Sequence, residues 1–300
     1  MEKPQPLVTT DWVISRLGPA TETHRASSGA PATHLVHVAA DRAEFERGHI
    51  PGAVFADIHT DLAKSGRPAE TGSVKRMYLV PTREEVAASL AAWGVAPGDR
   101  VVFYDGAGMN RLAIRGYWLL RLYRFPSDRV HVLDGGLTAW AANNGPMTTD
   151  ETAPVPVEST VPLGELDESL IATADDMLAW SSEAAAPGGP TRILDVRSID
   201  EYLGTDVRAA RGGRIPGALY RVFTEFVAPD GRLRTAPDAL AILRGGGVDP
   251  AELRATYCQG GVRAALVWFV LHEIAGLTEV RNYAGSWEEW GNRPELPVEK

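Results

Sequence analysis

The chain has 300 residues, of which 44% are hydrophobic and 23% are charged. This is the composition of a globular protein and excludes a disordered chain, while the length predicts two domains. The formal net charge of −9 disfavours nucleic acid or an anionic membrane as the main partner.

No segment of the sequence predicts a membrane span or a secretory signal. The apolar run at 264–271 has 8 residues, and a spanning helix needs about 20. The first twelve residues, MEKPQPLVTTDW, contain no apolar signal segment. We therefore expect a cytoplasmic protein with no membrane partner.

The first half of the chain alternates predicted strands with a predicted helix. Short runs rich in β-branched residues predict buried strands at 35–39 (LVHVA), 101–105 (VVFYD) and 130–134 (VHVLD). Between the first two, 83–93 (REEVAASLAAW) has apolar residues at three- and four-residue spacing, which indicates a helix. The segment that follows, 149–168, has several prolines and acidic residues and no sustained period, so it predicts an extended linker.

The second half repeats this alternation. Strands are predicted at 193–197 (ILDVR), 255–258 (ATYC) and 279–283 (EVRNY). The segment 264–274 (AALVWFVLHEI) is apolar almost all round, which predicts a well-buried helix. Alternation of strands and helices predicts an α/β fold in which each half forms an open, mostly parallel sheet with helices on both faces.

The two halves also share sequence. Three blocks occur in both halves in the same order: GHIPGA (48–53) with GRIPGA (213–218), GVAPGDRVVFYD (94–105) with GVDPAELRATYC (247–258), and LDGGLTAW (133–140) with YAGSWEEW (283–290). Ordered matches of this kind predict two copies of one domain. We place the copies at 1–148 and 169–300.

The single cysteine, Cys258, stands at the end of the predicted strand 255–258. One cysteine excludes an intrachain disulfide and a zinc site built from several thiolates. A lone cysteine is most often a small buried apolar residue. In an open parallel sheet, however, sites form just beyond the carboxyl ends of the strands, where Cys258 is predicted to lie.

The loop after Cys258 favours a reactive thiolate over a buried apolar role. Gly260 and Gly261 allow a tight turn between the strand and the following helix. Successive backbone N–H groups can then point at the sulfur, and Arg263 adds a positive charge at the end of the loop. Such surroundings stabilise a thiolate, which is the nucleophilic form of cysteine.

These motifs resemble those of a known family. The segments LDVR, GRIPGA, YCQGGVRA and YAGSWEEW resemble the rhodanese sulfurtransferases, and the tandem arrangement resembles the two-domain thiosulfate and mercaptopyruvate sulfurtransferases. The resemblance covers nearly the whole chain. It implies a catalytic second copy and a degenerate, non-catalytic first copy, in which Asp105 stands at the position of Cys258.

The resemblance implies a double-displacement reaction. The Cys258 thiolate attacks the outer sulfur of thiosulfate, sulfite leaves, and a Cys258 persulfide passes its sulfur to cyanide or a thiol. The loop N–H groups stabilise the charged sulfur. The expected partners are therefore a small anionic sulfur donor and a thiophilic acceptor, and no metal or organic cofactor is implied.

Further site residues are predicted around Cys258. The loop residues expected to bind the donor are Gln259, Gly260, Gly261, Val262 and Arg263. Arg208 and Arg211, before the GRIPGA motif, are further candidates for donor binding. Asp195 and Arg197 are expected to support the site, Arg197 by pairing with an acidic residue and Asp195 by holding the loop backbone.

Two positions depart from the pattern of the two-domain thiosulfate enzymes. Those enzymes have a lysine two places after the cysteine and an arginine just before the aromatic residue that follows the LDVR segment, and here those places hold Gly260 and Glu201. The loop shares Gly260–Val262 with the mercaptopyruvate type. Mercaptopyruvate therefore stays an alternative donor.

Other classes fit the sequence less well. Cysteine phosphatases have five residues between cysteine and arginine, whereas four separate Cys258 from Arg263. A cysteine hydrolase would need a partner histidine, and none lies in the repeat block beside Cys258. The string at 106–111 lacks the third glycine of a dinucleotide fingerprint, and no phosphate-binding GxxxxGK[ST] string occurs. A non-enzymatic rhodanese binding module also stays open.

Overall fold

The computed structural model describes residues 5–16, 31–66, 76–106, 109–151, 153–158, 161–184, 186 and 188–300. The chain divides into two compact units. Unit 1 comprises Met1–Ala63, Pro81–Asp167 and Pro229–Arg232, and unit 2 comprises Lys64–Val80, Glu168–Ala228 and Leu233–Lys300.

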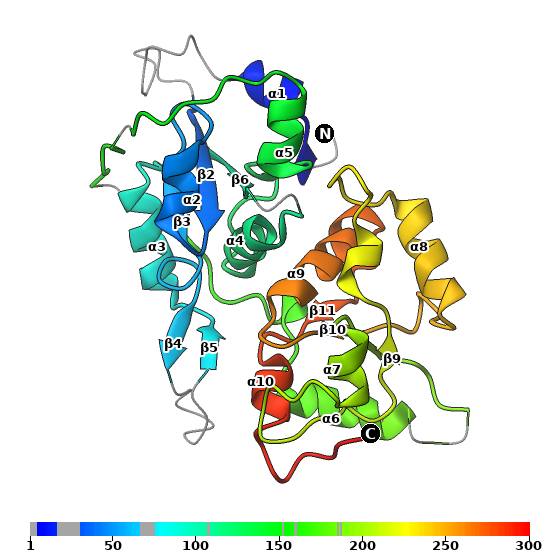
Figure 1. The fold of residues 1–300 in the computed structure, drawn as a ribbon. Coiled ribbons are helices and arrows are strands. Elements are labelled where there is room, and N and C mark those ends of the chain that lie inside the picture. The colour runs from blue at the N-terminus through cyan, green and yellow to red at the C-terminus, as the bar shows by residue number, and fades with distance from the viewer. Residues whose placement is uncertain are drawn as a thin grey trace. The chain divides into compact units, whose positions relative to one another are not determined.

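Unit 1 is built on a five-stranded sheet in the order β1-β7-β6-β2-β3, with every pairing parallel. Strands β2, β3 and β6 of this sheet are labelled in Figure 1. The predicted strands at 35–39, 101–105 and 130–134 are present as β2, β6 and β7. The strands are β1 (Leu7–Val8), β2 (Thr33–Ala39), β3 (Val54–Asp57), β6 (Arg100–Tyr104) and β7 (Val130–Leu133).

Helices cover both faces of this sheet. Successive side chains of a strand point to opposite sides, so β6 contributes apolar residues to the core on each face. Val102 and Tyr104 join a core cluster with Phe45 of α2 and Trp140 of α5. Phe103 packs on the other face, against Gly116 of α4. The helices are α1 (Thr10–Ile14), α2 (Arg42–Arg47), α3 (Arg83–Ala92), α4 (Arg111–Leu122) and α5 (Gly136–Ala142).

Unit 2 repeats the plan with a four-stranded parallel sheet in the order β11-β10-β8-β9. The position of β1 is taken by Ile171, which forms an isolated parallel bridge to Asn282. The predicted strands 193–197, 255–258 and 279–283 are present in shortened form. The strands are β8 (Ile193–Asp195), β9 (Leu219–Tyr220), β10 (Ala255–Tyr257) and β11 (Arg281–Asn282). The tandem α/β fold expected from the sequence is therefore confirmed.

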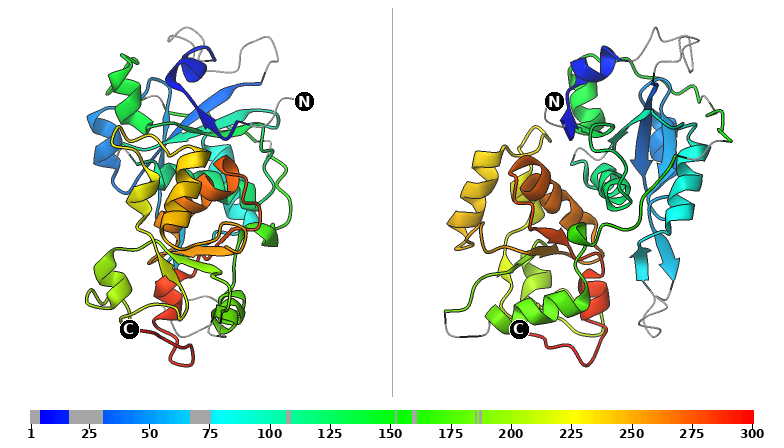
Figure 2. Two further views of the ribbon diagram at one scale, coloured as in Figure 1. Left: turned by 90° about the vertical axis from the view of Figure 1, so that its right-hand side faces the viewer. Right: turned by 180° about the vertical axis from the view of Figure 1, so that it is seen from behind.

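The helix predicted at 264–274 is present as α9 (Val262–Trp268), which continues as a π-helix, η3 (Phe269–Ile274). Residues 264–271 are fully buried, as an all-apolar helix requires. The neighbouring helix α8 lies beside this segment (Figure 2). The other helices are η1 (Glu168–Leu170), α6 (Ala174–Ala184), α7 (Ile199–Leu203), η2 (Phe223–Phe226), α8 (Ala236–Gly245) and α10 (Ser286–Trp290).

A hairpin from the first half of the sequence groups with unit 2. Its strands, β4 (Lys64–Gly66) and β5 (Arg76–Leu79), pair antiparallel, with Lys64 opposite Leu79. The hairpin follows β3 in the chain, yet residues 64–80 cluster with the copy that contains Cys258. The division at 149–168 assigns the segment 64–80 to the first copy, whereas in the structure this segment belongs to unit 2.

The predicted linker runs along unit 1. Its described residues between 150 and 167 form neither helix nor strand. Val157, Gly164 and Asp167 donate backbone hydrogen bonds to Ala91, Tyr123 and Leu122. Residues 152, 159 and 160 of the predicted linker lie outside the described residues.

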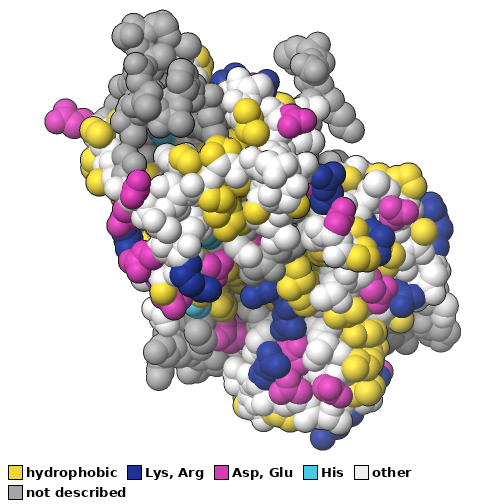
Figure 3. Space-filling model, turned by 45° about the horizontal axis from the view of Figure 1, so that its top comes forward, with side chains coloured by type: hydrophobic (Ala, Val, Ile, Leu, Met, Phe, Trp, Pro, Cys, Tyr) yellow, Lys and Arg dark blue, Asp and Glu magenta, His cyan; other side chains and the backbone are white. Residues whose placement is uncertain are grey.

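Two features of the described residues bear on partners. None of their helices has the length and hydropathy that a bilayer crossing requires. On the face shown in Figure 3, acidic and basic side chains are interspersed, rather than gathered in one patch of a single sign.

Candidate active site

Cys258 directly follows β10 and begins the loop that leads into α9. Its side chain is only 1% exposed. The loop turns at Gly261, which has φ of +82°, and a Cβ there would lie 2.9 Å from the backbone of Ala284. Glycine is required at this position because both the backbone angle and the close approach exclude a side chain.

A backbone N–H of the loop points at the Cys258 sulfur. The Gly261 N–H donates to Sγ at 3.1 Å. The Gly261 carbonyl in turn accepts from Nδ2 of Asn282 at 3.2 Å. A backbone donor aimed at the sulfur stabilises negative charge there, so the local geometry suits a thiolate or a charged persulfide.

The start of α10 holds the other side of the loop. The Cys258 N–H donates to Ser286 Oγ at 3.1 Å, and the Trp287 N–H donates to the Cys258 carbonyl at 3.0 Å. The Glu288 N–H donates to the Gln259 carbonyl at 2.8 Å. Ser286 has φ of +52°, an uncommon value for a residue with a side chain, and its hydroxyl also donates to the Tyr283 carbonyl at 2.8 Å.

Arg263 forms a two-pronged ion pair with Glu201. Its two terminal nitrogens donate to the two carboxylate oxygens of Glu201 at 2.7 and 2.8 Å. The side chains are 18% and 1% exposed. Although burial opposes ionisation, hydrogen bonds from Arg263 and the Ser198 N–H lower the pKa of Glu201 to about 2. Burial also opposes the charge of Arg263, but the hydrogen bond to Glu201 and the charge of that carboxylate raise its pKa above the ordinary value.

A second buried ion pair joins Asp195 and Arg197. Arg197 donates to the two Asp195 oxygens at 3.0 and 2.6 Å, and both side chains are at most 1% exposed. Asp195 also accepts from the Tyr257 hydroxyl, and Arg197 donates to the Gly213 carbonyl of the GRIPGA motif. The pair thus ties β8, the residue before Cys258 and the GRIPGA turn together.

The remaining predicted residues have defined contacts. Gln259 donates from Nε2 to the Arg208 carbonyl at 3.1 Å. The exposed Arg208 guanidinium pairs with Asp206 and lies 3.9 Å from Glu201. The Arg211 guanidinium donates to the carbonyls of four residues near the C-terminus, namely Trp290, Gly291, Arg293 and Leu296. Donor binding by Arg208 and Arg211 stays a prediction.

In the first copy a carboxylate stands at the corresponding place between strand and helix, where Asp105 follows β6 and α4 begins at Arg111. Asp105 is fully buried, and its two oxygens accept from the N–H groups of Asn110, Leu112 and Ala113 at 3.2, 3.0 and 3.5 Å. Burial outweighs these hydrogen bonds and raises the pKa of Asp105 to about 6. Residues 107 and 108 of this loop lie outside the described residues. The amides of the first copy therefore enclose an anionic side chain where the second copy has Cys258.

A model of the rhodanese-like domain matches the chain twice, at residues 21–143 and 174–293. The chain belongs to the rhodanese-like family. The thiosulfate sulfurtransferase of Azotobacter vinelandii is 35% identical over 275 residues, which cover 92% of this chain and 94% of the relative. The thiosulfate sulfurtransferase of Corynebacterium glutamicum is 32% identical over 305 residues, covering 99% and 91%.

Solved structures also share the fold of this chain. The anaerobic ergothioneine biosynthesis enzyme from Chlorobium limicola, in complex with trimethyl histidine, superposes with a TM-score of 0.74 at 25% identity. The match covers 98% of this chain and 70% of that enzyme. The resemblance inferred from the sequence motifs is thus confirmed at the level of the family.

Three residues of this rhodanese site were absent from the sequence prediction as site residues. Glu201 entered only as a departure from the family pattern, although Ser198 and Glu201 form the S-x-x-E capping box that marks a helix start. Ser286 lies in the repeated block YAGSWEEW but was not singled out as a site residue, and Tyr78, which packs on the loop, gave no local signal, because its contact with the loop joins distant parts of the chain.

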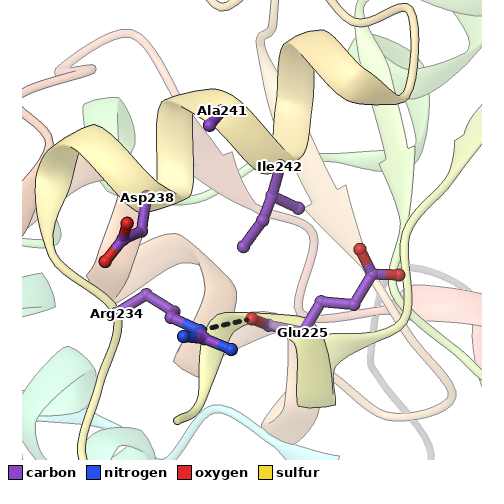
Figure 4. Close-up of a pocket in the computed structure, with 5 residues that line it drawn as sticks. All are labelled: Glu225, Arg234, Asp238, Ala241 and Ile242. Carbon is purple, nitrogen blue, oxygen red and sulfur yellow. Dashed lines mark hydrogen bonds between the residues drawn. The ribbon is translucent and has the colours of Figure 1, made fainter.

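The rhodanese unit 2 also has a separate surface pocket beside α8. It has a volume of about 400 Å³ and is lined by Glu225, Arg234, Asp238, Ala241 and Ile242 (Figure 4). Arg234 Nε donates to the Glu225 carbonyl at 3.2 Å. None of these residues belongs to the Cys258 loop. Among the residues that the structure describes, no group of three or more His, Cys, Asp or Glu side chains is placed to hold a metal ion.

Proposed function

We propose that this chain is a thiosulfate sulfurtransferase that carries the transferred sulfur on Cys258. The observation that carries the proposal is the hydrogen bond from the Gly261 N–H to Cys258 Sγ, in a loop at the carboxyl end of a parallel strand. Full-length relatives named thiosulfate sulfurtransferase support the choice of reaction.

The proposed first step forms the persulfide. The Cys258 thiolate attacks the outer sulfur of thiosulfate, the S–S bond of the donor breaks, and sulfite leaves with the bonding electron pair. The product carries a terminal negative sulfur, which the Gly261 N–H and neighbouring loop amides can stabilise. No proton has to be removed in this step if the thiol is already ionised.

The proposed second step regenerates the enzyme. The acceptor, a cyanide ion or a thiolate, attacks the terminal sulfur of the persulfide, and the Cys258 thiolate leaves with the electron pair. Thiocyanate or an acceptor persulfide is released. The chain contains no second cysteine that could resolve the persulfide internally, so the acceptor has to come from solution.

Mercaptopyruvate is the second candidate donor. Gly260 supplies no cation, and the charge of Arg263 is paired with Glu201. The loop therefore offers the thiosulfate dianion less unpaired positive charge than a loop with a lysine at position 260 would. A carboxylate monoanion requires less compensation. A cytoplasmic location and the identity of the acceptor stay predictions from the sequence.

Steady-state sulfur transfer to cyanide, with thiosulfate and mercaptopyruvate compared side by side, tests the proposal. We expect thiocyanate formation from thiosulfate with the higher kcat/KM. Higher kcat/KM with mercaptopyruvate would establish the second candidate. No thiocyanate from either donor would contradict sulfur transfer, and Cys258→Ser provides the background rate.

A further inference from the structure

Tyr78 packs against the loop that follows Cys258. It lies in β5 of the hairpin that groups with unit 2. A Cβ added to Gly260 would lie 2.7 Å from Tyr78 Cδ2 and 3.4 Å from Cε2. The aromatic ring therefore occupies the space into which a side chain at position 260 would project.

This contact is made close to the reactive sulfur. Gly260 lies between Cys258 and Gly261, whose N–H donates to Sγ. Gly260 is buried, and Cys258 is 1% exposed. The sulfur and the loop beside it are therefore covered from solvent, and the Tyr78 ring is one of the groups that pack on this loop.

We propose that Tyr78 is a specificity-determining residue of the Cys258 site, which restricts the donor to small sulfur compounds such as thiosulfate. The inference rests on the proposed function, because it concerns which sulfur donors the Cys258 site accepts. The ring fills volume beside Gly260, so a donor with a carbon skeleton meets its edge, whereas a compact inorganic anion needs less room. An aromatic edge also makes favourable contacts with sulfur.

Substitution of Tyr78 tests this role through the ratio of two donors. In Tyr78→Ala, kcat/KM for mercaptopyruvate relative to thiosulfate should rise about tenfold, the usual scale for opening a small volume in a pocket. Tyr78→Phe retains the ring and should keep the wild-type ratio. Leu79→Ala is the matched control, because Leu79 is adjacent in the hairpin but approaches Gly66 instead of Gly260.

A reciprocal substitution tests the contact itself. Gly260→Ala places a methyl group against the Tyr78 ring and should lower the rate of persulfide formation. In the Tyr78→Ala/Gly260→Ala double variant, most of that loss should be recovered. Equal effects of Gly260→Ala with and without the ring would contradict the proposed contact.

Thiol labelling separates this proposal from the proposed function. Cys258 is the only cysteine, so its labelling by iodoacetamide and by the bulkier N-phenylmaleimide can be followed without interference. Tyr78→Ala should accelerate labelling by the maleimide more than by iodoacetamide, even if no sulfur donor reacts. Parallel changes in both labelling rates and both donor rates would assign Tyr78 a structural role and overturn the proposal.

Discussion

Arg263 and Glu201 are 62 positions apart in the sequence, yet their side chains form a two-pronged ion pair at 2.7 and 2.8 Å. Glu201 is almost fully buried, while Arg263 ends the loop that starts at Cys258. The sequence predicts Arg263 as a donor-binding cation. The structure adds that the Glu201 carboxylate holds the Arg263 guanidinium in place. Loss of either side chain should therefore change both the charge beside Cys258 and the local packing.

Loss of Arg263 should weaken both catalysis and stability. If Arg263 makes a charge-assisted hydrogen bond to the donor, Arg263→Ala should lower kcat/KM about 10- to 150-fold, and Arg263→Lys should restore only part because an ammonium lacks the planar fork. Arg263→Ala also leaves Glu201 buried without its main partner, which should lower the free energy of unfolding by about 3 kcal/mol.

A double variant separates these two effects. In Arg263→Ala/Glu201→Gln the buried charge is removed together with its partner, so much of the stability should return. The kcat/KM should stay low, because the cation near the donor is still missing. Recovery of activity together with stability would show that Arg263 acts only through the fold.

Asp105→Ala should leave substantial sulfur transfer but lower stability. Its carboxylate accepts from three backbone N–H groups of the first copy. Without it these buried donors have no acceptor, which should lower the free energy of unfolding by about 1–3 kcal/mol. Asp105→Asn keeps one acceptor oxygen and should be milder. The measurements are chemical unfolding and kcat/KM, and an activity loss of several orders of magnitude in a folded Asp105→Ala protein would contradict a non-catalytic first copy.

Two buried groups of unit 1 should give opposite pH dependences of stability. Burial, with the charge of His49, lowers the pKa of His37 to about 4, so its imidazole contributes stability that is lost as pH falls from about 6.5 towards 4. Burial raises the pKa of Asp105 to about 6, so its contribution grows as pH falls through 6. The two trends partly cancel in the wild type.

Single substitutions should reveal these opposing trends. Between pH 6.5 and 4, the free energy of unfolding should fall more steeply in Asp105→Asn than in the wild type, and less steeply in His37→Phe. Urea unfolding at several pH values measures both slopes. Slopes equal to that of the wild type in both variants would contradict the assigned pKa shifts.

The strands and the tandem plan are predictable because they depend on local patterns. Buried parallel strands are short apolar runs that stand out in the sequence. The repeated blocks also reveal the tandem plan, because one pair follows β2 and β8 and another leads into β6 and β10. Strand β9 has two residues and the hairpin strand β4 reads KSG, so neither has enough apolar residues to give a periodic signal.

The site is less predictable than the fold because its contacts join distant residues. Cys258 and its glycines form one contiguous loop, so their chemistry can be inferred from spacing. Glu201 and Tyr78 reach that loop through the tertiary fold. Arg211 shows the opposite case. Its place before the GRIPGA motif predicts a donor-binding cation, whereas in the structure its guanidinium donates to four backbone carbonyls.

The most direct test of the account is the mass of the intact protein after incubation with thiosulfate and removal of excess donor. We predict the addition of one sulfur atom, located on Cys258 by peptide mapping and lost on treatment with cyanide. Cys258→Ser should fold normally, because the change in size is small, and should gain no sulfur. A wild-type protein that transfers sulfur without gaining mass at Cys258, or a Cys258→Ser protein that retains most of the activity, would contradict the persulfide mechanism.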